Sequence, residues 1–203
     1  MIKKYDDGYF TADLISSQFN GSVSVTRSKG LGLGLQEKKP GKIFLLAGGT
    51  GIYPFIDTID ILYKKALVDQ NHAMKQKILE KDPAVADPCL NDFSFTVYAS
   101  FNSHLDMHPM TLWQLSELSE MLPPNKFNCL LKIREYPKEK FATTYKGIKM
   151  STNRFEQFLN KELEGDKVDE LSQIYMCGPG KMTESILGVI GEMKLTLDKY
   201  TVI

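Results

Sequence analysis

Short apolar runs alternate with amphipathic segments from residue 42 to the end of the chain. The runs have the length and the apolar content of buried strands, and they fall at 43–47, 93–99, 127–133, 173–177 and, for a short final strand, 200–203. Strands that alternate with helices are typical of βαβ units. The pattern predicts an α/β fold that is doubly wound, with a mostly parallel five-stranded sheet and helices on both faces.

The segments between the runs carry apolar residues at the spacing of one helical face. Helices are predicted to start near Pro54, to cover 110–122 and 153–163, and to follow Pro179. The stretch 69–92 is polar, rich in lysine and interrupted by Pro83 and Pro88. We therefore expect a helical extension and a surface loop there, as an insertion between two strands.

Residues 1–41 have a different pattern. The segment 22–26 alternates as a strand does, and 30–34 is rich in glycine. This is β-type sequence, and it is too short to fold alone. We expect it to be the end of one domain, followed by a complete second domain at 42–203.

Composition narrows the class of protein. A chain of 203 residues suits one domain with an appendage, and its 25 basic and 25 acidic residues cancel, which disfavours nucleic acid as a partner. Cys89, Cys129 and Cys177 are widely spaced and odd in number, so a reducing compartment is expected. No apolar stretch of about 18 residues indicates a membrane segment in this chain, and we expect a cytoplasmic or cytosol-facing location.

A glycine turn joins the first strand to the first helix. Gly48, Gly49 and Gly51 let an anion approach the unpaired N–H groups of a helix start, Thr50 adds a hydroxyl donor, and Pro54 follows. A plain tight turn is the alternative reading of so short a motif. The sequence has neither a Walker motif nor the GxGxxG fingerprint, so the turn points to another class of nucleotide-binding protein.

A second loop follows the last long strand. Cys177, Gly178 and Pro179, with Met182 beyond them, fall at the carboxyl end of that strand. In a parallel sheet this is the same edge as the glycine turn. Taken alone, Cys177 would more often be a small buried residue than a reactive thiol.

Together, the motifs Ala-Gly-Gly-Thr-Gly-Ile at 47–52 and Tyr-Met-Cys-Gly-Pro at 175–179 resemble those of the NAD(P)-binding domain of the ferredoxin–NADP reductase superfamily. That superfamily includes cytochrome-reducing and ferric reductases. The resemblance implies that residues 42–203 are the whole nucleotide domain. It also implies that 1–41 is the C-terminal remnant of an antiparallel flavin-binding β-barrel, whose upstream flavin motif is missing from this chain.

The resemblance also assigns roles to single residues. Residues 48–51 would lie against the cofactor's pyrophosphate or nicotinamide ribose, and Cys177 would be the catalytic residue beside the nicotinamide. Thr11 would touch the flavin pyrophosphate, and Tyr200 would correspond to a C-terminal aromatic residue that shields the flavin ring. Tyr53 departs from the pattern, because the family has a small or hydroxyl residue there.

The choice of nucleotide depends on cations near the second strand. No Lys or Arg occurs at 96–125, whereas a 2′-phosphate is usually held by one. Ser100 and Asn102 suit ribose hydroxyls, so NADH is favoured. Lys132 and Arg134, which follow the third strand, keep NADPH as the alternative.

His104, Asp106 and His108 are the nearest approach to a metal motif. A metal site needs a further ligand, and the sequence offers none nearby. A solvated loop is the preferred interpretation, and no metal is predicted.

The leading hypothesis is an NAD(P)H-dependent flavoprotein oxidoreductase, of which this chain is the nucleotide-binding part and is incomplete for catalysis alone. It would deliver hydride to FAD in the missing barrel, and a haem, an iron centre or a small acceptor protein would take the electrons. A nucleotide-binding regulatory or assembly subunit without turnover is the alternative. A methyltransferase-like protein fits less well, because it would usually carry an acidic residue where Ser100 stands.

Overall fold

The computed structural model describes residues 33–203, apart from the side chains of His72 and Ala73. Residues Leu35–Ile203 form one compact unit. Most of the predicted fragment 1–41, including Thr11, lies outside the described residues. The barrel remnant and the boundary after residue 41 therefore stay predictions.

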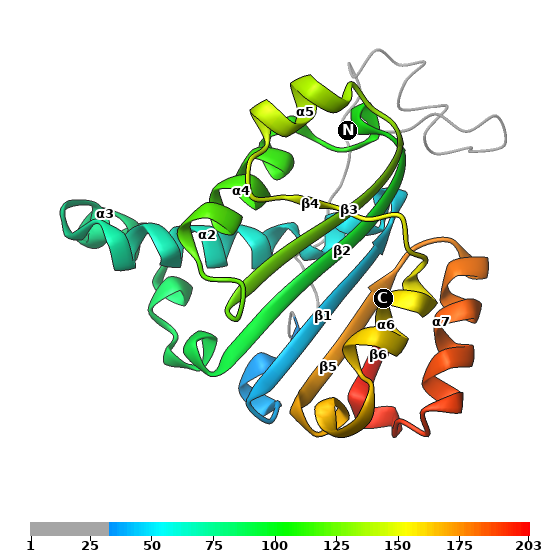
Figure 1. Cartoon of the computed structure of the whole chain (residues 1–203). Helices are drawn as coiled ribbons and strands as arrows, with labels where there is room; N and C mark the ends of the chain where they lie inside the picture. The colour runs from blue at the N-terminus through cyan, green and yellow to red at the C-terminus, as the bar shows by residue number, and fades with distance from the viewer. Residues whose placement is uncertain (1–32) are drawn as a thin grey trace, which may run out of the picture. The chain divides into compact units, whose positions relative to one another are not determined.

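One six-stranded sheet forms the centre of the described chain (Figure 1), and every strand pairs in parallel with its neighbours in the order β4-β3-β2-β1-β5-β6. The strands are Gly41–Gly48 (β1), Phe93–Ser103 (β2), Phe127–Glu135 (β3), Lys149–Met150 (β4), Leu171–Cys177 (β5) and Tyr200–Val202 (β6). The predicted doubly wound parallel sheet is confirmed. The number of strands was too low by one, because β4 has only two residues, both exposed, and no apolar run.

The helices are Ile56–Gln70 (α2), His72–Lys81 (α3), Pro109–Met121 (α4), Lys138–Thr144 (α5), Phe155–Glu162 (α6) and Gly180–Glu192 (α7). The four predicted helices correspond to α2, α4, α6 and α7. The first begins at Ile56 rather than near Pro54, because a 3-10 turn, Gly49–Phe55, comes before it. The sequence did not indicate α5, which buries only Phe141.

Helices cover both faces of the sheet. Phe44 and Leu46 of β1 pack with Phe158 of α6 and Ile186 of α7, and both helices lie in front of the sheet in Figure 1. Alternate residues of a strand point to opposite faces, so Leu45, which is fully buried, faces the other layer. In Figure 1, α2 runs behind the sheet.

The predicted insertion at 69–92 is largely helical. It contains the end of α2, all of α3 and two 3-10 turns, and α3 projects from the sheet (Figure 1). Lys64 Nζ of α2 forms ion pairs with Asp60, at 2.6 Å, and with Asp82 of the insertion, at 2.8 Å. The second pair ties the base of the insertion to α2. Nearby Val85 is 2% exposed. Among residues 33–203, no helix is both long and apolar enough to cross a bilayer.

Candidate functional site

The glycine turn lies at the carboxyl end of β1. The strand ends at Gly48, and Gly49 has a φ of +57°, in the left-handed region that favours glycine. No side chain caps the 3-10 turn Gly49–Phe55, and the first N–H groups of a helical turn have no acceptor within it. The turn therefore presents backbone donors that suit an anion.

A second uncapped helix start lies at the carboxyl end of β5. That strand ends at Cys177, and α7 begins three residues later with Pro179 as a cap residue that offers no side-chain hydrogen bond. The N–H of Met182 donates to the Pro179 carbonyl at 2.8 Å, which tightens the first turn. This loop also directs helix N–H groups toward the edge of the sheet.

Three glycines allow the two loops to pack directly against each other. A Cβ at Gly51 would collide with the Cys177 carbonyl group, and one at Gly48 would lie 2.5 Å from Met182 Sδ. A Cβ at Gly178 would lie 2.8 Å from the same sulfur and 3.0 Å from the Gly48 nitrogen. The absence of a side chain at these three glycines therefore allows the two loops to pack closely, with or without a ligand.

Other glycines of the loops lie in open space. A Cβ at Gly49 or at Gly180 would meet nothing within 4 Å. Thr50 and Pro54 are exposed beside Gly49. The paired loops thus have open space at Gly49 and at Gly180, where their helical turns begin.

The paired loops lie at the topological switch point of the sheet. Ala47 of β1 is in register with Ala99 of β2 on one side and with Cys177 of β5 on the other. The chain builds β2, β3 and β4 outward in one direction before it returns to place β5 and β6 in the other. Open α/β sheets bind ligands at this point, outside the carboxyl ends of the strands.

On the β2 side, polar side chains lie beside the glycine turn. Ser100 is in register with Gly48 and with Lys132 of β3, and parallel neighbours in register point to the same face. Asn102 and Arg134 are two residues further along their strands, and both are exposed. The structure thus brings Ser100 next to the end of β1, places Lys132 one strand further away in the same row, and places Asn102 and Arg134 two residues further along.

Cys177 is partly buried at the end of β5. Its burial raises the pKa of the thiol, so the side chain is uncharged at neutral pH. A thiolate nucleophile would need a lowered pKa. Cys177 is therefore a small, neutral side chain at the end of β5.

The last strand places Tyr200 away from the loops. Tyr200 is in register with Ile174, in the middle of β5, and packs against the hydrophobic core. Ile203 donates its N–H to the Met176 carbonyl at 2.9 Å, so it lies next to Cys177. Ile203 is 49% exposed. The sequence could not reveal that Ile203, rather than Tyr200, lies next to Cys177, because the register of so short a strand depends on its tertiary packing.

The histidine-rich loop after β2 forms structural hydrogen bonds. His104 Nδ1 lies 3.3 Å from the Glu135 carbonyl oxygen, and Asp106 accepts from the Ser103 N–H at 3.0 Å. His108 caps α4 by accepting from Met110 N–H at 3.3 Å. No group of three or more potential metal ligands occurs in the part of the chain that the structure describes.

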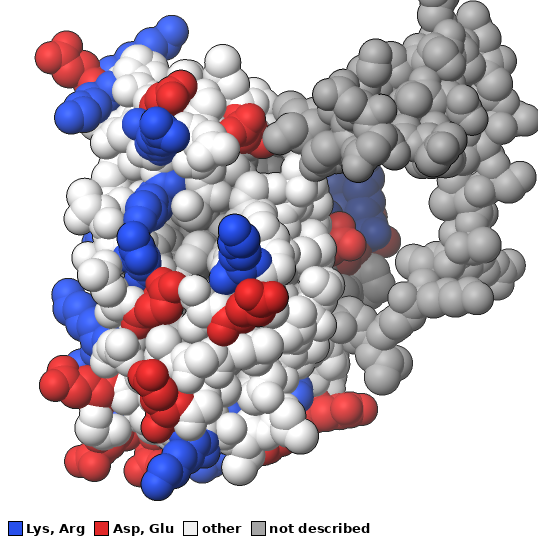
Figure 2. Space-filling model, turned by 90° about the vertical axis from the view of Figure 1, so that its right-hand side faces the viewer, with Lys and Arg blue, Asp and Glu red and all other residues white. Residues whose placement is uncertain are grey.

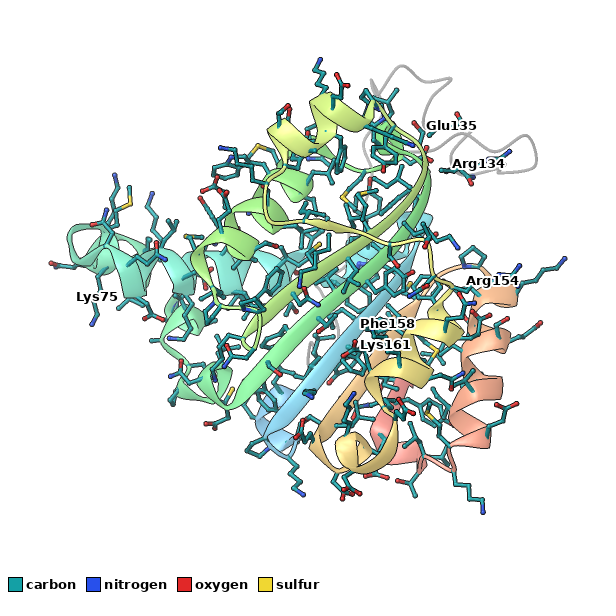
Figure 3. All side chains as sticks on the ribbon, in the orientation of Figure 1. Lys75, Arg134, Glu135, Arg154, Phe158 and Lys161 are labelled. Atoms are coloured by element: carbon teal, nitrogen blue, oxygen red, sulfur yellow. The ribbon has the colours of Figure 1, made fainter. Side chains whose placement is uncertain are left out.

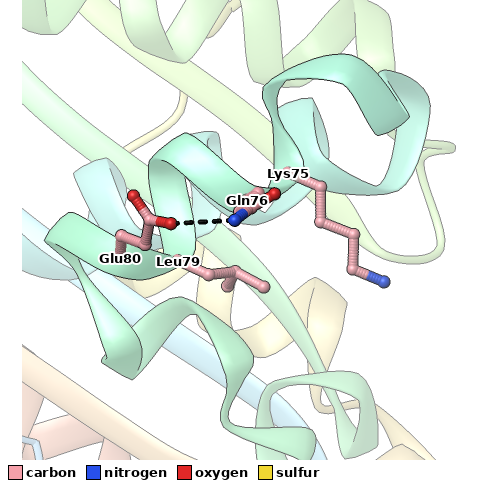
Figure 4. A pocket seen from close by; sticks show the side chains of 4 residues that line it. All are labelled: Lys75, Gln76, Leu79 and Glu80. Carbon is pink, nitrogen blue, oxygen red and sulfur yellow. Dashed lines mark hydrogen bonds between the residues drawn. The ribbon is translucent and has the colours of Figure 1, made fainter.

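A shallow hollow of about 500 Å³ lies on α3 (Figure 4), where Lys75, Gln76, Leu79 and Glu80 line it. Gln76 donates to Glu80 at 3.0 Å across it. All four residues belong to the projecting helix, so this hollow is separate from the paired loops. The face shown in Figure 2 carries basic and acidic side chains interspersed, without a broad patch of one sign.

No protein-family model matches the chain, and no curated protein matches it. Two solved structures are similar in fold. The CS-b5R domains of human Ncb5or, in an NAD+ form, share 16% identity with a TM-score of 0.56, covering 99% of this chain and 47% of that chain. Flavohemoglobin from Malassezia yamatoensis, with bound FAD and heme, shares 15% identity with a TM-score of 0.56, covering 100% of this chain and 42% of that chain.

The fold is a doubly wound α/β domain, and its paired loops lie at the switch point where such sheets bind ligands. More narrowly, the chain shares its fold with the CS-b5R domains of Ncb5or and with flavohemoglobin, in agreement with the resemblance that the two motifs carry. The chain spans less than half the length of either similar structure.

Proposed function

We propose that the chain is the nucleotide-binding domain of a flavoprotein oxidoreductase and holds NAD(P)H so that its hydride can pass to a flavin on another domain. The observation that carries the proposal is the direct contact of two uncapped loops at the switch point, between Gly51 and the Cys177 carbonyl. The two similar structures support it, since one is an NAD+ form and the other contains FAD and heme.

The residues present fit a dinucleotide. Backbone donors at the two loop starts suit the diphosphate, and the open space at Gly49 and Gly180 leaves room for it. Ser100 offers a hydroxyl to the adenosine ribose, and Lys132 lies in the same row to offset phosphate charge. Side chains at Gly49 and Gly180, or acidic groups beside them, would exclude such a ligand.

At the other end of the site, Cys177 is proposed to flank the nicotinamide. Its thiol is neutral because burial raises the pKa, so it can pack against the ring without polarising it. When bound, the nicotinamide supplies the hydride and the flavin accepts it. The protein's part is to orient the nicotinamide and to exclude water, and exposed Ile203 adds an apolar neighbour beside Cys177.

We further propose NADH as the preferred nucleotide, because β2 and the α4 region after it carry no Lys or Arg. Arg134 and Lys132 on β3 are the side chains that would favour NADPH instead. The proposed partners are a flavin-binding barrel and, beyond it, a haem, an iron centre or a small acceptor protein. These partners would act at the edge that carries Cys177.

The test begins with titration of NADH and NADPH into this chain by calorimetry. We expect saturable binding of NADH, with weaker binding of NADPH. Absence of binding by both nucleotides would refute the proposal. Binding without any NADH oxidation, when the chain is joined to a flavin-binding domain, would instead favour a regulatory or assembly subunit.

Replacement of Cys177 by Ala tests the catalytic assignment in the same experiment. The smaller side chain should leave NADH affinity within about twofold, because the proposed contacts to the diphosphate are made by backbone groups. It should slow hydride transfer in the flavin-containing protein, measured by stopped-flow, since ring orientation is lost. An unchanged rate would remove Cys177 from the mechanism.

A further inference from the structure

Residues 151–154, here called the strap, connect β4 to α6. The strap crosses in front of the sheet in Figure 1, from the edge strand toward α6. Its first residue, Ser151, donates its N–H to the Leu131 carbonyl of β3 at 2.7 Å. Its last, Arg154, donates its N–H to Gln157 Oε1 at 2.8 Å. Both ends are therefore fixed to regular structure.

The middle of the strap is fixed by the buried hydroxyl of Tyr98. That hydroxyl donates to the Asn153 carbonyl at 2.6 Å and lies 3.0 Å from Ser151 Oγ. A phenol has a single proton, so Ser151 Oγ must donate to the Tyr98 oxygen. The N–H of Asn153 donates back to Ser151 Oγ at 3.2 Å. The three residues are thus linked by a closed set of hydrogen bonds, and the bond that the Ser151 hydroxyl donates strengthens the one that the Tyr98 hydroxyl donates.

The ring of Tyr98 is held as firmly as its hydroxyl. The side chain is fully buried, and its ring centroid lies 4.8 Å from that of Phe155 and 4.9 Å from that of Phe158. Burial, as the largest effect, raises the pKa of the phenol, so the proton it donates is retained at neutral pH. The buried Tyr98 hydroxyl therefore holds the strap in place through its hydrogen bonds to Ser151 and Asn153.

The strap lies next to the candidate site. Tyr98 precedes Ser100 by two residues on β2, so both side chains point to the same face as Gly48 and Lys132. Ser151 is bonded at the level of Leu131, one residue before Lys132. The side chains that follow it on the strap, from Thr152 to Arg154, are exposed. Figure 3 shows Arg154 and Arg134 on the side toward which the strands run.

We propose that Tyr98 is a positioning residue of the nucleotide site, whose hydroxyl fixes the strap as the wall that the adenosine half of the cofactor contacts. This inference rests on the proposed function. The adenosine half is assigned to the side of β2 and β3 because Cys177, which is proposed to flank the nicotinamide, lies on the opposite side of β1. A wall fixed before binding lowers the entropy cost of binding.

The test compares Tyr98→Phe with the unaltered chain in calorimetric titrations of NADH and of ADP-ribose, which lacks nicotinamide. The variant keeps the ring and loses only the hydroxyl. We expect the Kd of both ligands to rise about five- to tenfold, as for loss of a hydrogen-bonded constraint. Ser151→Ala, which breaks the same closed set of hydrogen bonds, should shift both Kd values in the same direction.

Val189→Ala is the matched control. It removes packing from the same hydrophobic cluster, on α7, and leaves the Tyr98 hydrogen bonds intact. It should lower the urea midpoint at least as much as Tyr98→Phe while leaving both Kd values within about twofold, because its effect is on packing alone. If the unaltered chain binds NADH and Tyr98→Phe binds equally well, only this inference fails. If the unaltered chain binds no nucleotide, the proposed function fails with it.

Discussion

On the β5 side of the switch point, backbone packs against backbone, whereas on the β2 side polar side chains and the strap line the end of the sheet. Gly51 and Cys177 leave no room between them for even a methyl group. Ser100 and Lys132 present functional groups from neighbouring strands. The closed side fixes where the two loops lie, and the groups on the open side are those that we propose to contact the ligand. A substitution should therefore affect stability on the closed side and affinity on the open side.

The largest effect is expected on the closed side, from Gly51→Ala. The added Cβ would overlap the Cys177 carbonyl group, and backbone on both sides leaves no flexible atom to move away. We expect a loss of about 3 kcal/mol of unfolding free energy, at the upper end for overpacking. Urea unfolding followed by circular dichroism measures it. A loss below about 1 kcal/mol would show that the two loops can separate.

An intermediate effect is expected from Gly49→Ala. Space is available for the Cβ, but the φ of +57° is strained for an L-residue, which costs about 1–2 kcal/mol. Asn tolerates this conformation better, so Gly49→Asn should recover much of the stability. Both variants should bind NADH more weakly in calorimetry, because a side chain then occupies the open space at Gly49. Equal NADH affinity in Gly49→Asn and the unaltered chain would show that the cofactor does not approach Gly49.

The smallest effect is expected from Gly180→Ala. Its φ is not positive, a Cβ there meets nothing within 4 Å, and the residue begins α7. Stability should stay within about 0.5 kcal/mol of the unaltered chain, as for exposed substitutions elsewhere. This variant is the control for the other two, since it too adds one methyl group to a loop glycine. A large loss of stability would show that a loop glycine is needed even where a Cβ has space and φ is not positive.

The sequence predicted the elements whose signal is local. Apolar runs marked β1, β2, β3 and β5, and helical periodicity marked α2, α4, α6 and α7. β4 was missed because its two residues pair through the backbone alone, without burial. The first helix was placed too early, because Pro54 fits a 3-10 turn as well as an α-helix.

Some features of the candidate site could likewise be predicted from local sequence, and others could not. The residues of the two motifs lie together because parallel strands end at one edge, which spacing along the sequence can indicate. The role of Lys132 beside Ser100 depends on register between β2 and β3, and the position of Ile203 depends on register between β5 and β6. The role proposed for Tyr98 could not be predicted from the sequence, since a tyrosine in a buried strand resembles any other core aromatic residue.

The position of β1 in the sheet also has a consequence for folding. Among the described strands, β1 comes first along the chain but pairs on one side with β5, which follows only after β2, β3 and β4. Until then one edge of the central strand is open, and open apolar edges recruit other chains. A chain that stops before β5 would carry this edge exposed, so we expect it to aggregate more readily than the chain that includes β5.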